Sequence, residues 1–171
     1  MRKRAVVVLL AAAGLAVTLA ALEANHAVRT ACERTWVVQA SELAAFAMQA
    51  SAARNDLALV DRIAWMAKRD DVAYVVVLVP DGRAKFHSNP SEVGKTYDSE
   101  YARRALAAKE TITQEVARGG VLEVDVPLDN GVLRAGFSYG PLAPASRSLL
   151  GGAVLCWICV AAAGLLAFKT S

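Results

Sequence analysis

The chain has few of the residues that build catalytic and metal centres. It holds two histidines, His26 and His87, and three cysteines in 171 residues. No cluster of the kind that zinc requires can be picked out. No serine or cysteine stands in a recognisable nucleophile motif, and no glycine-rich phosphate loop follows a strand. We therefore predict no enzyme activity, no catalytic residue, no cofactor and no metal, and a small envelope enzyme is the least favoured alternative.

A strong excess of one charge is also lacking. The chain carries 19 Lys and Arg against 16 Asp and Glu, a net charge of +3 that sits mostly at its ends. Nothing therefore predicts nucleic-acid binding. No internal repeat, charge run or Pro/Gly/Ser-rich stretch divides the middle of the chain, and its length of about 126 residues suffices for one ordinary core.

Two uncharged apolar runs, Ala5–Leu22 and Leu149–Phe168, stand out in the sequence. As helices they would reach roughly 27 and 30 Å, the thickness of a bilayer core. Arg2, Lys3 and Arg4 precede the first run and Lys169 follows the second, which places both ends in the cytoplasm by the positive-inside rule. We predict a two-pass protein in the lipid bilayer of a bacterial inner membrane, with its middle in the periplasm. The alternative for the first run is a cleaved signal peptide.

These features divide the chain into segments. The predicted order is a cytoplasmic tail (1–4), a transmembrane helix (5–22), a long periplasmic helix (23–70), a folded core (71–142), a linker (143–148), a second transmembrane helix (149–168) and a cytoplasmic tail (169–171).

The segment from Glu23 to Lys68 is rich in alanine and contains no Gly or Pro, a composition typical of a helix. Asn55-Asp56 predicts a break and an N-cap that divide it into two helices. Apolar or small residues recur at spacings of three and four, interrupted by Gln39, at Cys32, Trp36, Leu43, Phe46, Ala50, Ala53, Leu57 and Val60. This stripe either packs on the domain's own sheet or forms a homodimer, for which Cys32, Trp36, Leu43 and Phe46 are the candidate contacts.

The three cysteines are scattered. Cys32 lies in the predicted exported part, where disulfides persist, so it is either a cross-link to a second chain or a buried free thiol. Cys156 and Cys159 lie inside the second apolar run, where we expect them to pack between helices.

After Asp71 the pattern changes to strands. The predicted strands are Val72–Val79, Arg83–Ser88, Thr111–Arg118, Val121–Leu128 and Val132–Tyr139. Turns at Pro80-Asp81-Gly82, Gly119-Gly120 and Asn130-Gly131 connect them. A loop (89–97) and a helix over Ser99–Glu110, with Asp98 as its N-cap, follow the second strand. The predicted fold class is α+β: a five-stranded antiparallel sheet with a long helix across one face.

Side chains of two kinds alternate along the last two strands. Leu133, Ala135 and Phe137 alternate with Arg134, Gly136 and Ser138, and Val124 and Val126 alternate in the same way with Glu123 and Asp125. If the long helix covers the apolar face, the opposite face presents Arg134, Ser138 and Asp125 beneath the segment 89–110, with the Tyr74 hydroxyl nearby. The alternative is a solvated outer face with ordinary cross-strand ion pairs.

The sequence RAKFHSNPSEVGKTY, with His87 and Val93-Gly94, resembles a segment of the PDC or Cache (PAS-like) sensor domains, distantly those of citrate and dicarboxylate sensor kinases. The later VDVPL…NGVLRAGFSYG resembles their closing hairpin. The resemblance implies an extracytoplasmic sensor domain between two transmembrane helices, with His87 in the ligand site. Ala84 and Asp125 stand where the carboxylate sensors carry cations, and Arg83 is shifted by one position onto the other face. The ligand therefore need not be citrate-like, and Arg134 beside Asp125 suits a zwitterion such as an amino acid.

The leading hypothesis is a membrane-anchored module that senses an amino acid or organic acid at His87, Arg134, Ser138, Asp125 and Tyr74. Ligand binding would close the segment 89–110 and shift the last strand against the long helix. The output would then lie either in a continuation of the reading frame or in a separate histidine kinase or receptor. The alternative is a ligand-independent envelope scaffold that recruits or dimerises with a partner membrane protein.

Overall fold

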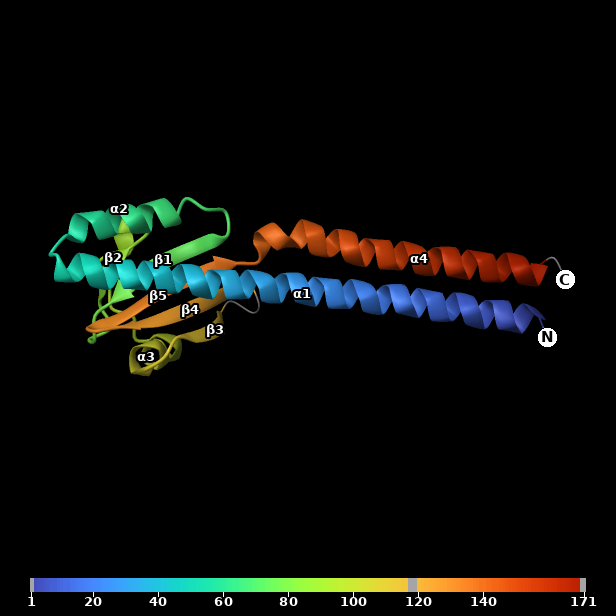
Figure 1. Ribbon diagram of the computed structural model, residues 1–171, viewed down its shortest axis with the longest axis horizontal. Coiled ribbons are helices and arrows are strands. Elements are labelled where there is room, and N and C mark those ends of the chain that lie inside the picture. The colour runs from blue at the N-terminus through green and yellow to red at the C-terminus, as the bar shows by residue number, and fades with distance from the viewer. Residues whose placement is uncertain (1, 117–119, 170–171) are drawn as a thin grey trace. The chain divides into compact units, whose positions relative to one another are not determined.

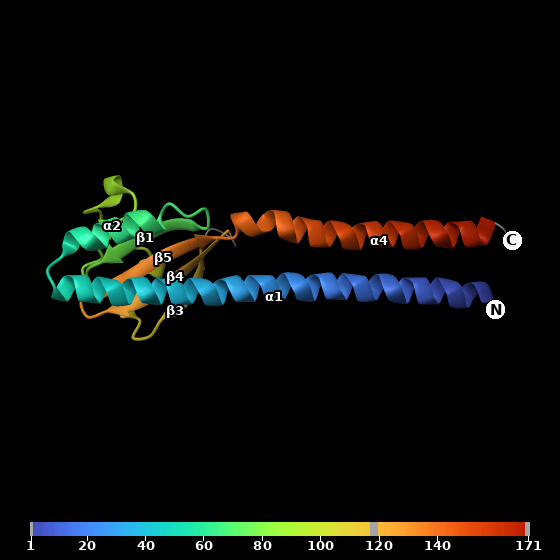
Figure 2. The ribbon, with the colours of Figure 1, turned by 45° about the horizontal axis from the view of Figure 1, so that its top comes forward.

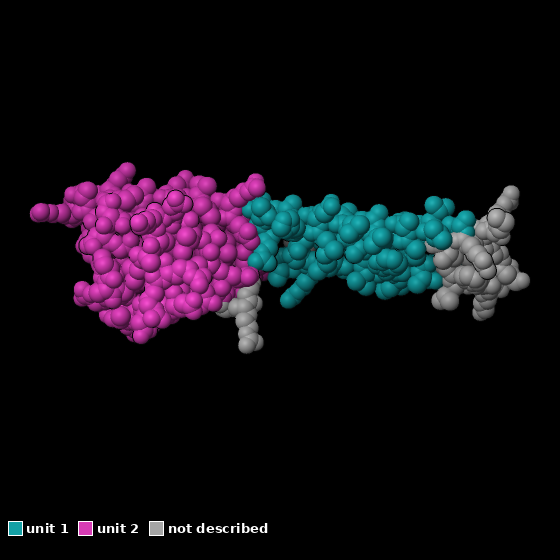
Figure 3. Space-filling view, turned by 90° about the horizontal axis from the view of Figure 1, so that it is seen from below, with its two compact units in different colours: residues 1–31, 142–171 teal, residues 32–141 magenta. Residues whose placement is uncertain are grey.

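The computed structural model describes residues 2–116 and 120–169. The chain divides into two compact units, coloured separately in Figure 3. The first unit consists of residues 1–31 and 142–171, and the second of residues 32–141. The apolar runs lie in the first unit and the sheet in the second, and the helix α1 (Arg2–Ala52) contributes to both.

The first unit pairs the N-terminal part of α1 with α4 (Ala143–Lys169), which run side by side in Figures 1 and 2. Both helices are long and apolar enough to cross a membrane, with windows of mean hydropathy 1.8 and 1.6 that are only 6% buried. A core helix of a soluble protein would be mostly buried. Residues 143–148, predicted as a linker, instead form the start of α4, because their Ala- and Ser-rich sequence continues directly into the apolar helix.

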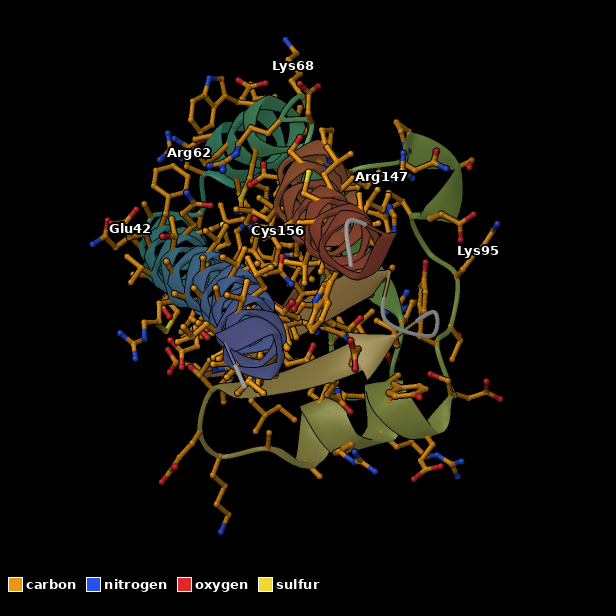
Figure 4. The ribbon with its side chains drawn as sticks, turned by 90° about the vertical axis from the view of Figure 1, so that its right-hand side faces the viewer. Glu42, Arg62, Lys68, Lys95, Arg147 and Cys156 are labelled. Carbon is orange, nitrogen blue, oxygen red and sulfur yellow. The ribbon has the colours of Figure 1, made fainter. Side chains whose placement is uncertain are left out.

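Two polar contacts join these helices. The Trp157 indole donates a hydrogen bond to Thr18 Oγ1 at 2.8 Å, and Ser146 Oγ lies 2.6 Å from Asn25 Oδ1. Gly14 allows the close approach, because a Cβ atom there would stand 3.4 Å from the Trp157 ring. Cys156, labelled in Figure 4, and Cys159 are free thiols, half-buried and exposed respectively.

The second unit contains a five-stranded sheet of order β2-β1-β5-β4-β3 in which every neighbouring pair is antiparallel. Its strands are β1 (Val72–Leu78), β2 (Ala84–His87), β3 (Ile112–Val116), β4 (Val121–Leu128) and β5 (Gly131–Ser138). The predicted α+β class and its five strands are confirmed. The end of the third predicted strand and part of the Gly119-Gly120 turn fall outside the described residues.

The shorter helices begin at side-chain caps. Asn55 caps α2 (Asp56–Met66) by accepting the Ala58 N–H, as predicted. The helix predicted over Ser99–Glu110 is α3 (Glu100–Ala107), and its cap is Ser99, which accepts the Ala102 N–H, rather than Asp98. The cap lies one residue later because the Ser99 hydroxyl reaches the free amide of the third helical residue, Ala102. Two short 3-10 helices, η1 (Pro90–Glu92) and η2 (Gly140–Leu142), complete the unit.

One face of the sheet packs against α1 and α2. Trp36 stacks on Phe137 with ring centroids 5.3 Å apart, and Leu43, Leu59 and Ile63 are buried in the same layer. The predicted stripe therefore packs on the domain's own sheet at Trp36, Leu43 and Ala50, whereas Ala53, Leu57 and Val60 at its end are exposed. This corrects the predicted dimer contact at two positions, since Trp36 and Leu43 are each 3% exposed and closed to a second subunit. Cys32 and Phe46 stay half-buried.

The opposite face is covered by α3. Ala102 and Ala105 of α3 pack with Val76, Leu78 and Val132, and Tyr97 packs beside them. In Figure 4, α2 and α3 lie on opposite sides of the strands. The sheet is thus the middle layer of three, as its two covered faces require.

A polar clamp ties α1 to the ends of β1 and β5. The Trp36 indole donates to Asp71 Oδ2 at 2.9 Å, and Arg69 donates to both oxygens of the same carboxylate. Arg69 holds the pKa of Asp71 below its usual value, against the opposing effect of burial. Tyr139, just after β5, reaches Glu33 of α1 at 2.6 Å. We call Glu33, Trp36, Arg69, Asp71 and Tyr139 the clamp.

Candidate functional site

A row of polar side chains crosses the face of the sheet beneath α3, and we call it the polar row. Its members come from every strand: His87 (β2), Tyr74 (β1), Arg134 (β5), Glu123 and Asp125 (β4) and Gln114 (β3). The cross-strand register explains the grouping, since His87, Val76, Arg134 and Asp125 are successive partners, and so are Tyr74, Gly136, Glu123 and Gln114. Directly opposed residues share a face.

The centre of the polar row is an ion cluster. Arg134 forms an ion pair with Glu123 through Nη2, and its Nε donates to Asp125 Oδ1 at 3.2 Å. Gln114 Nε2 donates to Asp125 Oδ2 at 2.5 Å and to the Tyr101 carbonyl at 3.3 Å. The Tyr74 hydroxyl donates to Glu123. Two carboxylates thus share one guanidinium.

The cluster is buried. Asp125 is 0% exposed, Glu123 1%, Arg134 4% and Gln114 5%. A solvated outer face, the alternative left open by the sequence, is therefore excluded. The charged residues Glu42, Arg62, Lys68 and Lys95 in Figure 4 show the contrast, because they point away from the body of the second unit.

Burial and crowding of like charges change the acid–base behaviour of the cluster. Burial, together with the nearby Glu123 carboxylate, raises the pKa of Asp125 to about 7, although Gln114 and Arg134 act in the opposite direction. Burial would lower the pKa of Arg134, but Glu123 and Asp125 raise it overall, so the guanidinium stays charged. Burial and Glu123 raise the pKa of Tyr74, so its phenol remains a hydrogen-bond donor.

Gly136 makes room for Tyr74. A Cβ atom on Gly136 would lie 2.5 Å from the Tyr74 ring, which no side chain tolerates. Glycine inside a strand commonly marks such a close approach. The ring passes over Gly136 on β5, which brings its hydroxyl to Glu123 on β4. Gly136, which the sequence placed on the polar face of its strand, therefore positions Tyr74 in the site.

His87 lies at the edge of the polar row. Its ring is roughly parallel to those of Tyr74 and Tyr97, with centroids 6.4 and 6.3 Å away. Its Nδ1 accepts the Asn89 N–H at 2.8 Å, which assigns the proton of the neutral ring to Nε2. Burial lowers the pKa of His87, although Glu92 acts in the opposite direction. Asn89 caps η1, so His87 also supports the start of the covering loop.

The structure brings together four of the five predicted site residues: His87, Tyr74, Asp125 and Arg134. Ser138 differs, because its hydroxyl accepts the Gly140 N–H at 3.0 Å in a local turn after β5. Sequence reasoning missed Glu123 and Gln114 as members of the site. The alternation of β4 already placed Glu123 beside Asp125, but Gln114 lacked any comparable signal.

A resident metal ion is not indicated by the side chains. Across residues 2–116 and 120–169, no group of three or more His, Cys, Asp or Glu is placed to hold one. The carboxylates of the polar row instead take hydrogen bonds from Arg134, Gln114 and Tyr74.

Comparisons with known proteins agree with the fold. No curated protein matches the chain significantly. Among solved structures, the extracellular domain of the candidate histidine kinase rpHK1S-Z16 has a similar fold, with a TM-score of 0.56 and 16% identity over 79% of this chain. This chain spans 59% of the length of that one.

The family comparison covers most of the chain. A family model described as single Cache domain 3 matches residues 18–148, which include the whole second unit and the polar row. The resemblance to Cache sensor domains predicted from the sequence is thereby confirmed. The chain belongs to the single Cache domain 3 family.

Proposed function

We propose that this chain is a membrane-anchored extracytoplasmic sensing module that binds a small polar molecule at the polar row. The observation that carries the proposal is a buried ion cluster on one face of a sheet whose other face already provides an apolar core. Buried ionisable groups with shifted pKa values gather at functional sites more often than elsewhere. The role is one of binding and includes no chemical step.

The stability of the fold gives little reason to retain such a cluster. Removing two carboxylates and a guanidinium from water costs several kcal/mol per ion, about as much as their mutual attraction returns. An apolar replacement of similar volume is often equally stable or more stable. A ligand that exchanges its own polar groups for some of these contacts would explain why the charges are kept.

Within the second unit, a series of contacts leads from the polar row to α1, the helix that contributes to both units. β5 carries Arg134 within the polar row and Phe137 against Trp36, and Tyr139 follows it in the clamp. A movement of β5 would therefore act on α1 through packed rings and hydrogen bonds. Sensor transitions commonly involve element shifts of about 1 to 2 Å. α1 and α4 continue into the two apolar runs, so such a shift would reach the bilayer.

The remaining features of the proposal concern location and partners. Both apolar helices would span a bacterial inner membrane, with the second unit in the periplasm and both ends in the cytoplasm. Cys32 and Phe46 remain the candidate contacts of a homodimer. A histidine kinase or receptor is the class of protein that would receive the signal.

The test is a thermal unfolding screen of the full chain in nonionic micelles against amino acids and organic acids. We expect at least one compound to raise the unfolding temperature in a saturable way. Replacing His87 by Ala should weaken that response, while the exposed Lys95→Ala should not. A broad screen without any hit would contradict the sensing role.

One observation favours a second candidate, a ligand-independent scaffold that recruits another envelope protein. Arg134, Glu123, Asp125 and Tyr74 already satisfy one another, as a structural cluster would. A tight complex with a membrane protein that His87→Ala leaves unchanged, together with an empty ligand screen, would support this candidate.

A further inference from the structure

One acceptor at the edge of the polar row has no partner. Gln114 is 5% exposed, and its Oε1 makes no hydrogen bond in the part of the chain that the structure describes. Its orientation is set by the amide nitrogen, which donates to two acceptors, Asp125 Oδ2 and the Tyr101 carbonyl. The oxygen therefore faces away from both. A buried acceptor without a donor costs about 1–3 kcal/mol, so this position calls for a donor.

The residue that carries this buried oxygen also lines a hollow. Gln114 lines a surface hollow of about 470 Å³ between the end of α3 and β3. The other lining residues are Ala107, Ala108, Ile112, Thr113 and Arg104. The wall is mostly aliphatic, and the one charged group, Arg104, is an exposed side chain that pairs with Glu100 at 3.2 Å. The hollow thus suits a short aliphatic chain with one polar end.

The charged cluster next to Gln114 determines whether the polar end of such a ligand should be a cation or an anion. Glu123 and Asp125 share the single guanidinium of Arg134, so the cluster lacks one positive charge whenever both acids are ionised. Two of the three guanidinium nitrogens already bind these carboxylates. An anionic ligand would have only the remaining nitrogen, Nη1, to bind and would be repelled by both acids. A cation with an N–H group would instead supply the missing positive charge of the cluster and a donor for Gln114 Oε1.

We propose that the ligand of the polar row is a small aliphatic monoamine, bound as its ammonium ion in the hollow between α3 and β3 with an N–H donated to Gln114 Oε1. The Asp125 and Glu123 carboxylates balance its charge. Arg104 at the rim acts against a second positive charge, so a diamine binds more weakly. This inference rests on the proposed sensing function and names the ligand class of the same site.

The test compares two ions of matched length and opposite charge. Isothermal titration calorimetry of the full chain in nonionic micelles would use n-butylammonium chloride and sodium butyrate. We expect saturable binding of n-butylammonium, about tenfold or more tighter than that of butyrate. The affinity for n-butylammonium should increase from pH 6 to pH 8, because the ammonium stays charged over this range while the Asp125 carboxyl group loses its proton. The charged and titratable groups that face Asp125 are Glu123, Arg134 and the Tyr74 hydroxyl.

Variants separate the two contacts. Asp125→Asn should weaken n-butylammonium binding at least about tenfold, the loss expected for a hydrogen-bonded charge. Gln114→Met, which keeps the side-chain length and removes the acceptor, should weaken it several-fold and still permits the test if Asp125→Asn does not fold. The exposed carboxyl-to-amide control Glu110→Gln should leave binding unchanged.

The possible outcomes distinguish this inference from the sensing role. Butyrate or another anion that binds in place of the amine would overturn the inference and leave the sensing function standing. Amine binding that is unaffected by both Asp125→Asn and Gln114→Met would also overturn it. A chain that binds neither ion, nor any compound in the broad screen, would contradict both proposals.

Discussion

Both faces of the sheet are buried, but only the face beneath α3 combines its apolar residues with a buried ion cluster. Beneath α1 and α2, the face presents apolar side chains such as Leu133 and Phe137, both 0% exposed. Beneath α3, the same strands present Asp125 at 0% and Arg134 at 4%. Neighbouring positions of β5 thus serve the two faces. Side chains alternate between the two faces along a strand, so neighbouring residues of β5 belong either to the apolar core or to the polar row that we propose binds a ligand.

The comparison separates burial from stabilisation. Burying a large apolar side chain contributes roughly 1.5–3 kcal/mol, whereas a buried ion cluster contributes close to nothing once desolvation is included. The helix that covers the polar row, α3, is only eight residues long, whereas the other face is covered by the much longer α1. The apolar face should therefore control the free energy of unfolding, and the polar face should control its response to pH and ligand.

The largest expected effect is at the apolar face. Phe137→Ala should lower the free energy of unfolding by about 4 kcal/mol, because it removes a fully buried ring that stacks on Trp36. Urea unfolding of the micelle-bound chain, followed by tryptophan fluorescence, measures this change. The control Leu57→Ala removes an apolar side chain that is 72% exposed and should cost less than about 0.5 kcal/mol. Equal effects would contradict the assigned core.

The next largest loss in the free energy of unfolding is expected when one partner is removed from the ion cluster. Arg134→Met should cost about 3 kcal/mol in the same assay, because it leaves two buried carboxylates without their cation. Part of the loss should be recovered at low pH, where the acids become neutral. The exposed Arg103→Met serves as the control and should change stability little. A cost that does not depend on pH would argue against the charge explanation.

A smaller effect tests how Tyr74 is positioned. Gly136→Ala should destabilise the chain by about 2 kcal/mol, because the new methyl group would stand 2.5 Å from the Tyr74 ring. Combining it with Tyr74→Ala removes the clash, so the two changes should cost less together than the sum of their separate effects. Additive costs would show that the ring does not occupy this space.

The most gradual effect is a slope of the free energy of unfolding with pH. Asp125 has a pKa of about 7 in the fold against 3.8 as its ordinary value, so the folded chain holds an extra proton between these values. Its contribution to stability is present below the lower pKa and is lost as pH rises toward 7. Asp125→Asn should remove this fall, which is at most about 1.4 kcal/mol per pH unit. Urea unfolding at pH 4.5, 6 and 7.5 tests it, and a variant as pH-dependent as the natural chain would contradict it.

Much of the fold was predictable because it rests on local patterns. The alternation of Phe137 with Arg134 and Gly136 assigned the two faces, and Asn55 correctly marked the start of α2. A hairpin turn was also expected correctly between β4 and β5, although it lies at Asp129-Asn130 and not at Asn130-Gly131, and Gly131, with a φ of +126°, opens β5 opposite Leu128. Each of these signals depends on neighbours within a few residues.

The candidate site was only partly predictable because it depends on distant contacts. Whether Arg134 and Asp125 face water or lie buried depends on where α3 packs, which no local pattern states. Gln114 joins the site through register with β4 and a bond to Tyr101 of α3. Trp36 and Leu43 fit a dimer stripe and a core equally well by spacing, and only the observed sheet decides between them. Ser138 shares the alternation but lies at the strand end, where the turn takes its hydroxyl.

The central claim is that the polar row is retained for binding and not for folding. Its most direct test is thermal unfolding of an apolar variant that combines Tyr74→Phe, Glu123→Leu, Asp125→Leu and Arg134→Met. We predict an unfolding temperature equal to or above that of the natural chain, with no response to any ligand that stabilises the natural chain. An unfolding temperature as low as that of Arg134→Met alone, or an intact ligand response, would contradict the claim.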